Sequence, residues 1–412
     1  MPFVMRRNLF FFLLVVLTHF GAPNRKVFAV VVQKWPVKLH SNSSVSLEAG
    51  ENNTIFFDSD VTTIHNKLTL YVDDDVDFSS EFEPAAKALD ELEADFFEAF
   101  QVAPISLCGG YACAFLDDKS LKCWGYNGGG QLGLGDINNR GDAPGEMGDN
   151  LPAVDLGTGR TATAIFCKYS HACALLDDKS VKCWGNNYSG QLGLGDKYSR
   201  GGAVFEMGDN LPAVDLGTGR TATAVSMGDS MSGYACALLD NKSVKCWGSN
   251  YNGQLGLGDT NNRGDAPGEM GDNLPAVDLG TGRTATAISI GGSHTCALLD
   301  DKSVKCWGYN YNGELGLGDT NNRGDAPGEM GDNLPAVDLG TGRMATAILN
   351  DGSRTCALLD NKSVKCWGYN YSGQLGLGDT NNRGDAPGEM GDYLPAVDLG
   401  SNYVPTYFNE DV

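Results

Sequence analysis

The stretch "TATAISIGGSHTCALLDDKSVKCWGYNYNGELGLGDTNNRGDAPGEMGDNLPAVDLGTGR", which runs from Thr284 to Arg343, decides the fold. Its apolar or alternating runs are short, and the turn signals G-G, D-D-K, N-G and P-G separate them. No helical period persists inside it. We therefore predict that this stretch forms a small antiparallel sheet of about four strands.

The same unit recurs along the chain, and the tripeptide Cys-Trp-Gly marks each copy. The copies begin at Cys123, Cys183, Cys246, Cys306 and Cys366, with steps of 60, 63, 60 and 60 residues. One such sheet has two faces to bury and cannot bury both alone, whereas sheets arranged around an axis cover one another as in a β-propeller. We expect an all-β propeller of five blades over 105–404, closed by the segment 395–408 or completed by strands from the N-terminal segment.

The pattern "G-x-x-H-x-C-A-L-L … V-K-C-W-G-Y-N … G-Q-L-G-L-G-D" resembles the repeat of the regulator of chromosome condensation family, over roughly Ile105 to Leu399. The resemblance implies a propeller whose blades have four antiparallel strands. Family members usually have more and shorter blades than the five long units present here. Some members are exchange factors for small guanine-nucleotide-binding proteins and engage chromatin.

The N-terminus resembles a secretory signal over residues 1–29. Arg6 and Arg7 precede the apolar run Leu9 to Leu17, and Val27-Phe28-Ala29 offers a cleavage site. We therefore expect a secreted or lumenal product, with an uncleaved anchor as the alternative.

An extension, 30–104, follows the signal. It contains strand-like runs at 45–49, 54–59 and 67–72. Ser80 to Glu83 forms a capping box before a helix predicted at about 81–101, with Leu89, Leu92, Phe96 and Phe100 on one face. This helix is expected to dock on the first blade or, alternatively, to bind a partner. Residues 405–412 are a tail.

Each unit contains two cysteines separated by nine residues, and these nine residues include a turn. With a three-residue loop the two cysteines of a hairpin face each other within disulfide reach. No C-x2-C knuckle and no recurring histidine support zinc instead. The predicted pairs are Cys113/Cys123, Cys173/Cys183, Cys236/Cys246, Cys296/Cys306 and Cys356/Cys366. Cys108 and Cys167 are extra, and either bridge neighbouring blades or are both free.

The formal net charge of −22 repels nucleic acid and anionic membranes, so neither is expected as a direct partner, nor is any membrane contact after signal cleavage. A protein partner is expected, with no prediction of its identity or of the oligomeric state. Glycosylation sequons are consistent with secretion. They begin at Asn42, Asn52, Asn187, Asn241, Asn361 and Asn370.

The tripeptide R-G-D recurs in the long loop of four units, whereas the second unit has Arg200-Gly201-Gly202. Loop glycines supply unusual backbone angles, and Arg263 is expected to pair with an acid of its own or the next blade. The candidate partner-binding residues of this loop are Arg140, Asp142, Arg263, Asp265, Arg323, Asp325, Arg383 and Asp385. Asp259, Asn261 and Asp265 offer a weak calcium pattern, but Met270 stands where the twelfth-position Glu would be. No other cofactor is expected.

Catalysis needs different groups converging at one place, whereas nearly identical units present the same side chains repeatedly. No G-x-S-x-G, H-E-x-x-H or phosphate loop occurs. We therefore predict a secreted, non-catalytic propeller that acts as a protein-binding scaffold through its long loops. The alternatives are a regulator that resembles the guanine-nucleotide exchange factors of the family, and a secreted enzyme built on a propeller frame.

Overall fold

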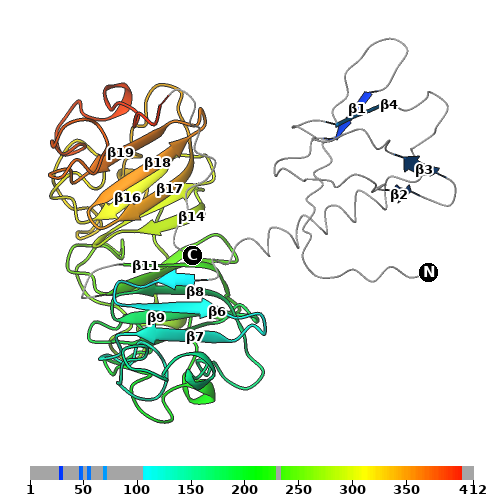
Figure 1. Cartoon of the computed structure of the whole chain (residues 1–412). Coiled ribbons are helices and arrows are strands. Elements are labelled where there is room, and N and C mark those ends of the chain that lie inside the picture. The colour runs from blue at the N-terminus through cyan, green and yellow to red at the C-terminus, as the bar shows by residue number, and fades with distance from the viewer. Residues whose placement is uncertain are drawn as a thin grey trace. The chain divides into compact units, whose positions relative to one another are not determined.

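The computed structural model describes residues 105–228 and 233–400, together with four short strands nearer the N-terminus (Figure 1). The chain divides into two units, Met1–Phe96 and Phe97–Val412. Residues 1–26 of the predicted signal segment, the predicted helix at 81–101, Asn42, Asn52 and the tail lie outside the described residues.

The N-terminal unit contains two antiparallel strand pairs. Strand β1 (Val27–Val30) pairs with β4 (Leu68–Tyr71), and β2 (Ser46–Ala49) pairs with β3 (Asn53–Phe56). Each of the three strand-like runs predicted in the extension overlaps one of these strands. Strand β1 includes the predicted cleavage site at Ala29.

The repeat unit consists of five antiparallel sheets, so the predicted all-β, five-bladed propeller is confirmed. Each sheet has the middle strand of its blade between the other two. The strands of blades 1 to 5 are, in chain order, β5 (Ile105–Leu107), β6 (Tyr111–Phe115) and β7 (Leu121–Gly125); β8 (Ala162–Lys168), β9 (His171–Leu176) and β10 (Val181–Gly185); β11 (Ala222–Met227), β12 (Tyr234–Leu239) and β13 (Val244–Gly248); β14 (Ala285–Ile290), β15 (His294–Leu299) and β16 (Val304–Gly308); β17 (Ala345–Asp351), β18 (Arg354–Leu359) and β19 (Val364–Gly368).

The expected fourth strand of each blade is reduced to a single bridge. In blade 3 Gly248 pairs with Arg263 alone, and the other blades repeat this bridge. Gly264 follows with φ of +80°, a left-handed angle that turns the chain out of the sheet. The run "PAVDL" is not a strand either, because Pro275 has no N–H to donate, although the N–H of Val277 still bonds to the carbonyl of Val244.

A short 3-10 turn closes the long loop of each blade. These turns are Gly148–Asn150, Gly208–Asn210, Gly271–Asn273, Gly331–Asn333 and Gly391–Tyr393. In the last blade Val397 bonds to the carbonyl of Val364, so the described part of the predicted closing segment packs on its own blade. Residues 401–408 of that segment lie outside the described residues, and closure of a ring through them stays a prediction.

The core of the repeat unit lies between neighbouring blades. Each of four apolar clusters joins the inner side of one blade to the Cys-Trp-Gly tryptophan of the next, and a fifth, smaller cluster lies in the last blade. The side chains of Trp184, Trp247, Trp307 and Trp367 are fully buried, whereas Trp124 of the first blade is only half-buried. The tryptophan is therefore a structural residue of the joint between blades.

Candidate functional site

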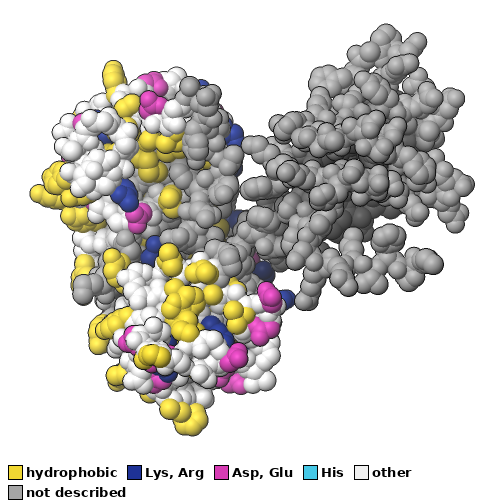
Figure 2. Space-filling view, viewed as in Figure 1, with side chains coloured by type: hydrophobic (Ala, Val, Ile, Leu, Met, Phe, Trp, Pro, Cys, Tyr) yellow, Lys and Arg dark blue, Asp and Glu magenta, His cyan; other side chains and the backbone are white. Residues whose placement is uncertain are grey.

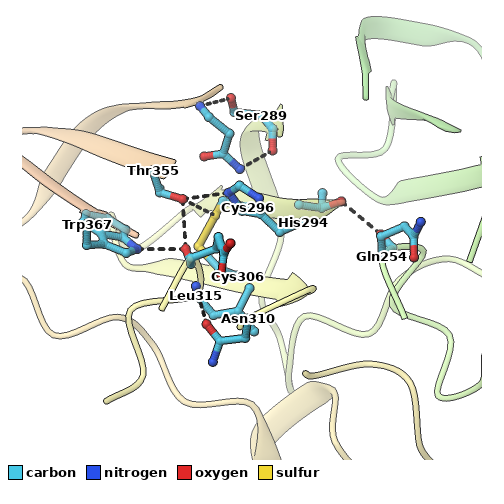
Figure 3. Close-up of a disulfide and its surroundings, with 12 residues drawn as sticks. Gln254, Ser289, His294, Cys296, Cys306, Asn310, Leu315, Thr355 and Trp367 are labelled. Carbon is cyan, nitrogen blue, oxygen red and sulfur yellow. Dashed lines mark hydrogen bonds between the residues drawn. A yellow bond between two sulfur atoms is a disulfide. The ribbon is translucent and has the colours of Figure 1, made fainter. Parts of the chain in front are cut away.

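The joint between blades is built from a tryptophan and a main-chain carbonyl of the preceding blade. The indole Nε1 of Trp367 donates a 3.0 Å hydrogen bond to the carbonyl of Glu314 (Figure 3). Thr355 donates to the same carbonyl at 3.0 Å and also contacts Nε2 of His294 at 2.9 Å. These bonds lie beside the disulfide of Cys296 (Figure 3), so polar contacts and a covalent link meet where two blades pack. Trp184, Trp247 and Trp307 make the equivalent bond.

The R-G-D loop belongs to the same joint. A Cβ atom placed on Gly253 would collide with the main-chain nitrogen of Asp325 in the next blade, so the two backbones are in direct contact. Gly190 and Gly313 stand in the same relation to Asp265 and Asp385. Gly258 also donates a hydrogen bond of 2.9 Å to the carbonyl of the R-G-D glycine in the next blade. Copies of R-G-D after the first blade are therefore covered by a neighbouring blade.

The arginine of each R-G-D loop is used inside its own loop. Arg263 is paired with Asp259 at 2.6 Å, and it also donates to the carbonyls of Asn261 and Asn262. Burial alone would raise the pKa of Asp259, but the hydrogen bonds from Arg263 and the N–H of Asn261 outweigh it, and the pKa lies below its ordinary value. The expected pairing of Arg263 with an acid of its own blade is present. The equivalent pairs are Arg140–Asp136, Arg200–Asp196, Arg323–Asp319 and Arg383–Asp379.

Side chains of the R-G-D loop are engaged in contacts within the repeat unit, and partner binding by this loop stays a prediction. Arg263 is mostly buried against its partner, and Asp265 makes a 3.0 Å ion pair with Lys197 of the preceding blade. Because Arg263 already neutralises Asp259, the calcium pattern of this loop has lost one of its ligands. Among residues 105–228 and 233–400, no group of three metal-ligating side chains gathers at one place.

All twelve cysteines of the chain are paired in the structure. In each hairpin the register is the one predicted, with Cys296 opposite Cys306 and their Cα atoms 4.1 Å apart. Cys108 pairs with Cys167, whose Cα atom lies 5.1 Å away, and this bond links blade 1 to blade 2. The bridging alternative for these two residues is the one that the structure contains. The other hairpin pairs are Cys113–Cys123, Cys173–Cys183, Cys236–Cys246 and Cys356–Cys366.

Two of the predicted glycosylation sites are at odds with the structure. Asn187 and Asn370 are fully buried, and Nδ2 of Asn187 donates a 2.8 Å hydrogen bond to the carbonyl of Asp196. A glycan needs this nitrogen, so the folded blade leaves no room for one. Asn241 and Asn361 lie exposed at hairpin turns and keep glycosylation as a prediction.

A cavity of about 640 Å³ lies between the first strands of the blades. Strands β8, β11, β14 and β17 supply most of its wall, including Phe166, Ser289 and Asn350. The side chain and the N–H of Asn350 bond to Ser289, which ties β17 to β14. Two of the lining residues, Arg354 and Asp351, form an ion pair at 2.5 Å. The cavity wall thus mixes apolar and polar groups. Of its charged residues, Lys168, Asp351 and Arg354 stand at the turns of first hairpins, whereas Lys179 lies in the turn between β9 and β10.

Exposed tyrosines stand on the loops that begin at this same end of the blades. In each loop a buried asparagine fixes the backbone, as Asn310 does by accepting from the N–H of Leu315 and donating to the carbonyl of Asp319. The next residue is a tyrosine whose side chain is 65–75% exposed. These residues, which we call the tyrosine face, are Tyr188, Tyr251, Tyr311 and Tyr371. Figure 2 shows hydrophobic side chains, the colour class that includes tyrosine, in several patches on the visible side of the repeat unit.

The tyrosine face lies at the end of the blades where the cavity-lining strands turn back. The N–H of Tyr309 bonds to the carbonyl of Ser293, and the N–H of Tyr369 bonds to that of Ser353, both at 2.9 Å. Ser293 and Ser353 lie in the turns that follow the cavity-lining strands β14 and β17. None of the residues predicted from the sequence includes these tyrosines, although a tyrosine follows the buried asparagine in four of the five units.

The histidines of the described residues are not placed for surface chemistry. His171 and His294 are both buried, and burial lowers the pKa of His171 to about 4 and that of His294 to about 3. Both imidazoles are therefore neutral near pH 7. None of the described helices has the length and apolar composition needed to cross a bilayer.

Comparison with known proteins identifies the repeat. Two sequence models of the regulator of chromosome condensation (RCC1) repeat match, one over residues 162–191, 223–254, 285–314 and 352–374, the other over 243–298. The ultraviolet-B receptor UVR8 of Arabidopsis thaliana is 28% identical over 68% of this chain and 56% of its own. The RCC1 domain-containing mitochondrial protein RUG3 of the same plant is 27% identical over 68% of this chain and 57% of its own. The chain thus spans little more than half of either relative.

Among solved structures, yeast RCC1 (Prp20) bound to Kap60 is 17% identical, with a TM-score of 0.45 over 64% of this chain and 55% of its own. The repeat models match the segments that form blades 2 to 5 of the structure. Residues 162–374 of this chain therefore contain repeats of the regulator of chromosome condensation (RCC1) type, the family that the sequence resembles.

Proposed function

We propose that this chain is a secreted, non-catalytic scaffold that binds a protein partner on its tyrosine face. The observation that carries the proposal is the recurrence of an exposed tyrosine at one position of four blades, each on a loop held by a buried asparagine. A rigid loop that exposes an aromatic side chain loses little conformational entropy when it binds.

Tyrosine is well suited to protein recognition. Its ring buries a large apolar area while its hydroxyl group keeps a hydrogen-bonding partner, and tyrosines are enriched among the residues that dominate interface energies. Tyr311 stacks on Tyr309, with ring centroids 6.4 Å apart, and Tyr371 packs on Tyr369 at 4.8 Å. These contacts restrict the exposed rings further, which favours binding of a partner with a complementary apolar surface.

The R-G-D loops support the same choice of face by elimination. Their arginines are paired internally, and copies after the first blade contact the preceding blade. The proposed partner therefore contacts the tyrosine face and not the arginines of these loops.

Two observations support the non-catalytic and secreted parts of the proposal. Histidine is the commonest general base in enzymes, and the two histidines among the described residues are buried and neutral, so neither is available at the described surface. Six disulfides in one chain are typical of an oxidising compartment. Secretion itself is tested by expressing the full chain in a secreting host and reading the N-terminus of the released protein, which should begin near Val30.

The partner surface is tested by capture with the oxidised, full-length protein from the fluid that surrounds the producing cells. A variant with serine at all four positions of the tyrosine face should lose the captured protein while its thermal unfolding stays unchanged. The matched control replaces four exposed hairpin-turn lysines at the other end of the blades with asparagine, which tolerates their left-handed angle. These lysines are Lys179, Lys242, Lys302 and Lys362.

Equal capture by the wild type and the tyrosine-face variant would refute this placement of the partner. Loss of capture in the lysine variant alone would move the interface to the hairpin turns. If the protein is instead a guanine-nucleotide exchange factor, adding it to a small GTPase should accelerate release of the bound nucleotide. The scaffold requires no such acceleration.

A further inference from the structure

The first and last blades each expose one half of a joint that is complete everywhere else. One half, which we call the socket, consists in the last blade of Gly373, Gln374, Gly376 and Gly378. The other half, which we call the plug, consists in the first blade of Trp124 and the loop 140–144. Inside the repeat unit, sockets and plugs of neighbouring blades meet four times.

A filled socket is in close contact with the next blade. A Cβ atom placed on Gly316 would lie 2.8 Å from the indole nitrogen of Trp367, and one on Gly318 would lie 3.4 Å from the carbonyl oxygen of Ala386. The N–H of Gly318 also bonds to the carbonyl of Gly384 at 2.9 Å. The space above the socket glycines is therefore filled by the next blade, which contributes the indole of Trp367 and the backbone of Gly384 and Ala386.

The socket of the last blade is empty among the described residues. Within 4 Å of a Cβ atom on Gly376 the contacts are with Val397 of the same blade, and around Gly378 there is none. Gly376 is exposed, whereas Gly316 and Gly256 are buried. The adjoining apolar cluster is correspondingly small and contains no tryptophan.

The plug of the first blade is uncovered in the same way. Trp124 is half-buried, and among the described contacts its indole nitrogen makes no hydrogen bond. Met147 is 42% exposed, whereas the equivalent Met207 of the next blade is 8% exposed. The neighbouring loop borders an open hollow of about 630 Å³, whose wall includes Ile137 and Arg140. The tryptophan and the segment R-G-D-A-P of this surface recur in three of the four surfaces that fill internal sockets, and the second blade differs only by Gly202 and Val204 in that segment.

The geometry points to a second copy of this chain as the occupant. We propose that the plug of one molecule enters the socket of another, giving head-to-tail association. Figure 1 shows β7 and β19 at opposite ends of the repeat unit, so plug and socket of one molecule do not meet. A contact between two different surfaces of identical molecules is heterologous, and it produces closed rings or open chains according to its rotation. The four internal joints show that these two surfaces are complementary.

The test uses the oxidised full-length protein and two variants that each damage one half of the joint. Trp124→Ala removes the indole of the plug, and Gly376→Asn fills the socket with a residue that tolerates the φ of +69° found there. In analytical ultracentrifugation the wild type should grow in mass with concentration, whereas each variant alone should sediment as a monomer. An equimolar mixture of the two variants should give a one-to-one dimer and nothing larger, because it contains one intact plug and one intact socket.

Lys302→Asn is the control, because it changes an exposed hairpin-turn side chain that belongs to neither half of the joint, and it should assemble as the wild type does. Thermal unfolding of the variants checks that each is folded. A wild type that stays monomeric at all concentrations would overturn the proposal. In that case, acrylamide quenching of tryptophan fluorescence in a Trp35→Phe variant would report mainly on Trp124, because the other four tryptophans are buried. A Trp124 shielded from acrylamide would indicate ring closure within one chain. Failure of the variant mixture to dimerise would refute the second copy as occupant even if the wild type associates.

Discussion

The indole N–H of Trp247 donates a 3.0 Å hydrogen bond to the main-chain carbonyl of Gln191, across the joint between the second and third blades. Both residues are buried, so no water replaces this bond when it is lost. We expect Trp247→Phe to lower the free energy of unfolding by about 1–3 kcal/mol, the cost of leaving a buried carbonyl without its partner. Chemical denaturation followed by far-ultraviolet circular dichroism measures the loss. The indole of Trp124 makes no such bond among the described contacts. Trp124→Phe should therefore lower the free energy of unfolding clearly less, at concentrations where the protein is monomeric.

Gly190 and Gly373 occupy equivalent positions and have nearly the same φ, +79° and +76°. Alanine at either position incurs the left-handed penalty of roughly 1–2 kcal/mol. Only at Gly190 would the added methyl group collide with the next blade, at the main-chain nitrogen of Asp265. Gly190→Ala should therefore destabilise by about 1–3 kcal/mol more than Gly373→Ala, a typical cost of overpacking. Equal unfolding midpoints for the two variants would contradict the assignment of this glycine to the joint.

The disulfide of Cys108 and Cys167 closes a loop with a sequence separation of 59, whereas the hairpin disulfides close loops with a separation of 10. If a cross-link acts mainly on the entropy of the unfolded chain, the longer loop stabilises more, by roughly 4 kcal/mol against about 3 kcal/mol. The double variant Cys108→Ala/Cys167→Ala should therefore lose more stability than Cys236→Ala/Cys246→Ala. Thermal unfolding without reductant compares the two, and the reverse order would count against the entropic account for this chain.

The buried histidines make stability depend on pH. Because burial holds the pKa of His171 near 4 and that of His294 near 3, the unfolded chain binds more protons than the folded chain below about pH 6.5. Stability should be fully present above pH 6.5 and fall as the pH drops toward 4, by roughly 1.4 kcal/mol per pH unit for each histidine. Denaturation midpoints measured between pH 7 and pH 4.5 test this slope.

The control for the pH prediction comes from the chain itself, since Tyr111 and Tyr234 stand at the equivalent position in blades 1 and 3. Their hydroxyl groups donate 2.7 Å hydrogen bonds to the carbonyls of His171 and His294 in the following blades. The double variant His171→Tyr/His294→Tyr should fold and should lose the pH dependence in this window. An unchanged slope in that variant would assign the effect to other groups.

The sequence predicted the elements whose causes are local. The hairpin register that sets Cys296 opposite Cys306 follows from the length of one turn, and the five units follow from the repeat. The pairing of Arg263 with an acid of its own loop also needed only nearby residues. These features could be predicted because each depends on a short segment and its chemistry.

What the sequence did not reveal depends on how the loops fold and on contacts between one unit and the next. The role of R-G-D in the joint arises where Gly253 approaches Asp325, more than one full repeat away along the chain. Asn187 lies in a sequon, and only the loop that folds around it shows that its side chain is consumed by internal hydrogen bonds. The tyrosine face likewise emerges when separate blades bring their loops to one end.

The identity of the joints also affects how a chain of this kind can change its length. Because every internal joint uses the same tryptophan, carbonyl and glycine contacts, a blade gained or lost as a whole unit leaves matching surfaces on both sides of the alteration. Unequal recombination between near-identical gene segments would therefore produce foldable proteins with four or six blades, whereas a deletion that ends within a unit would separate a tryptophan from its acceptor. Selection can then act on the number of blades as an inherited variable, independent of changes in any single residue.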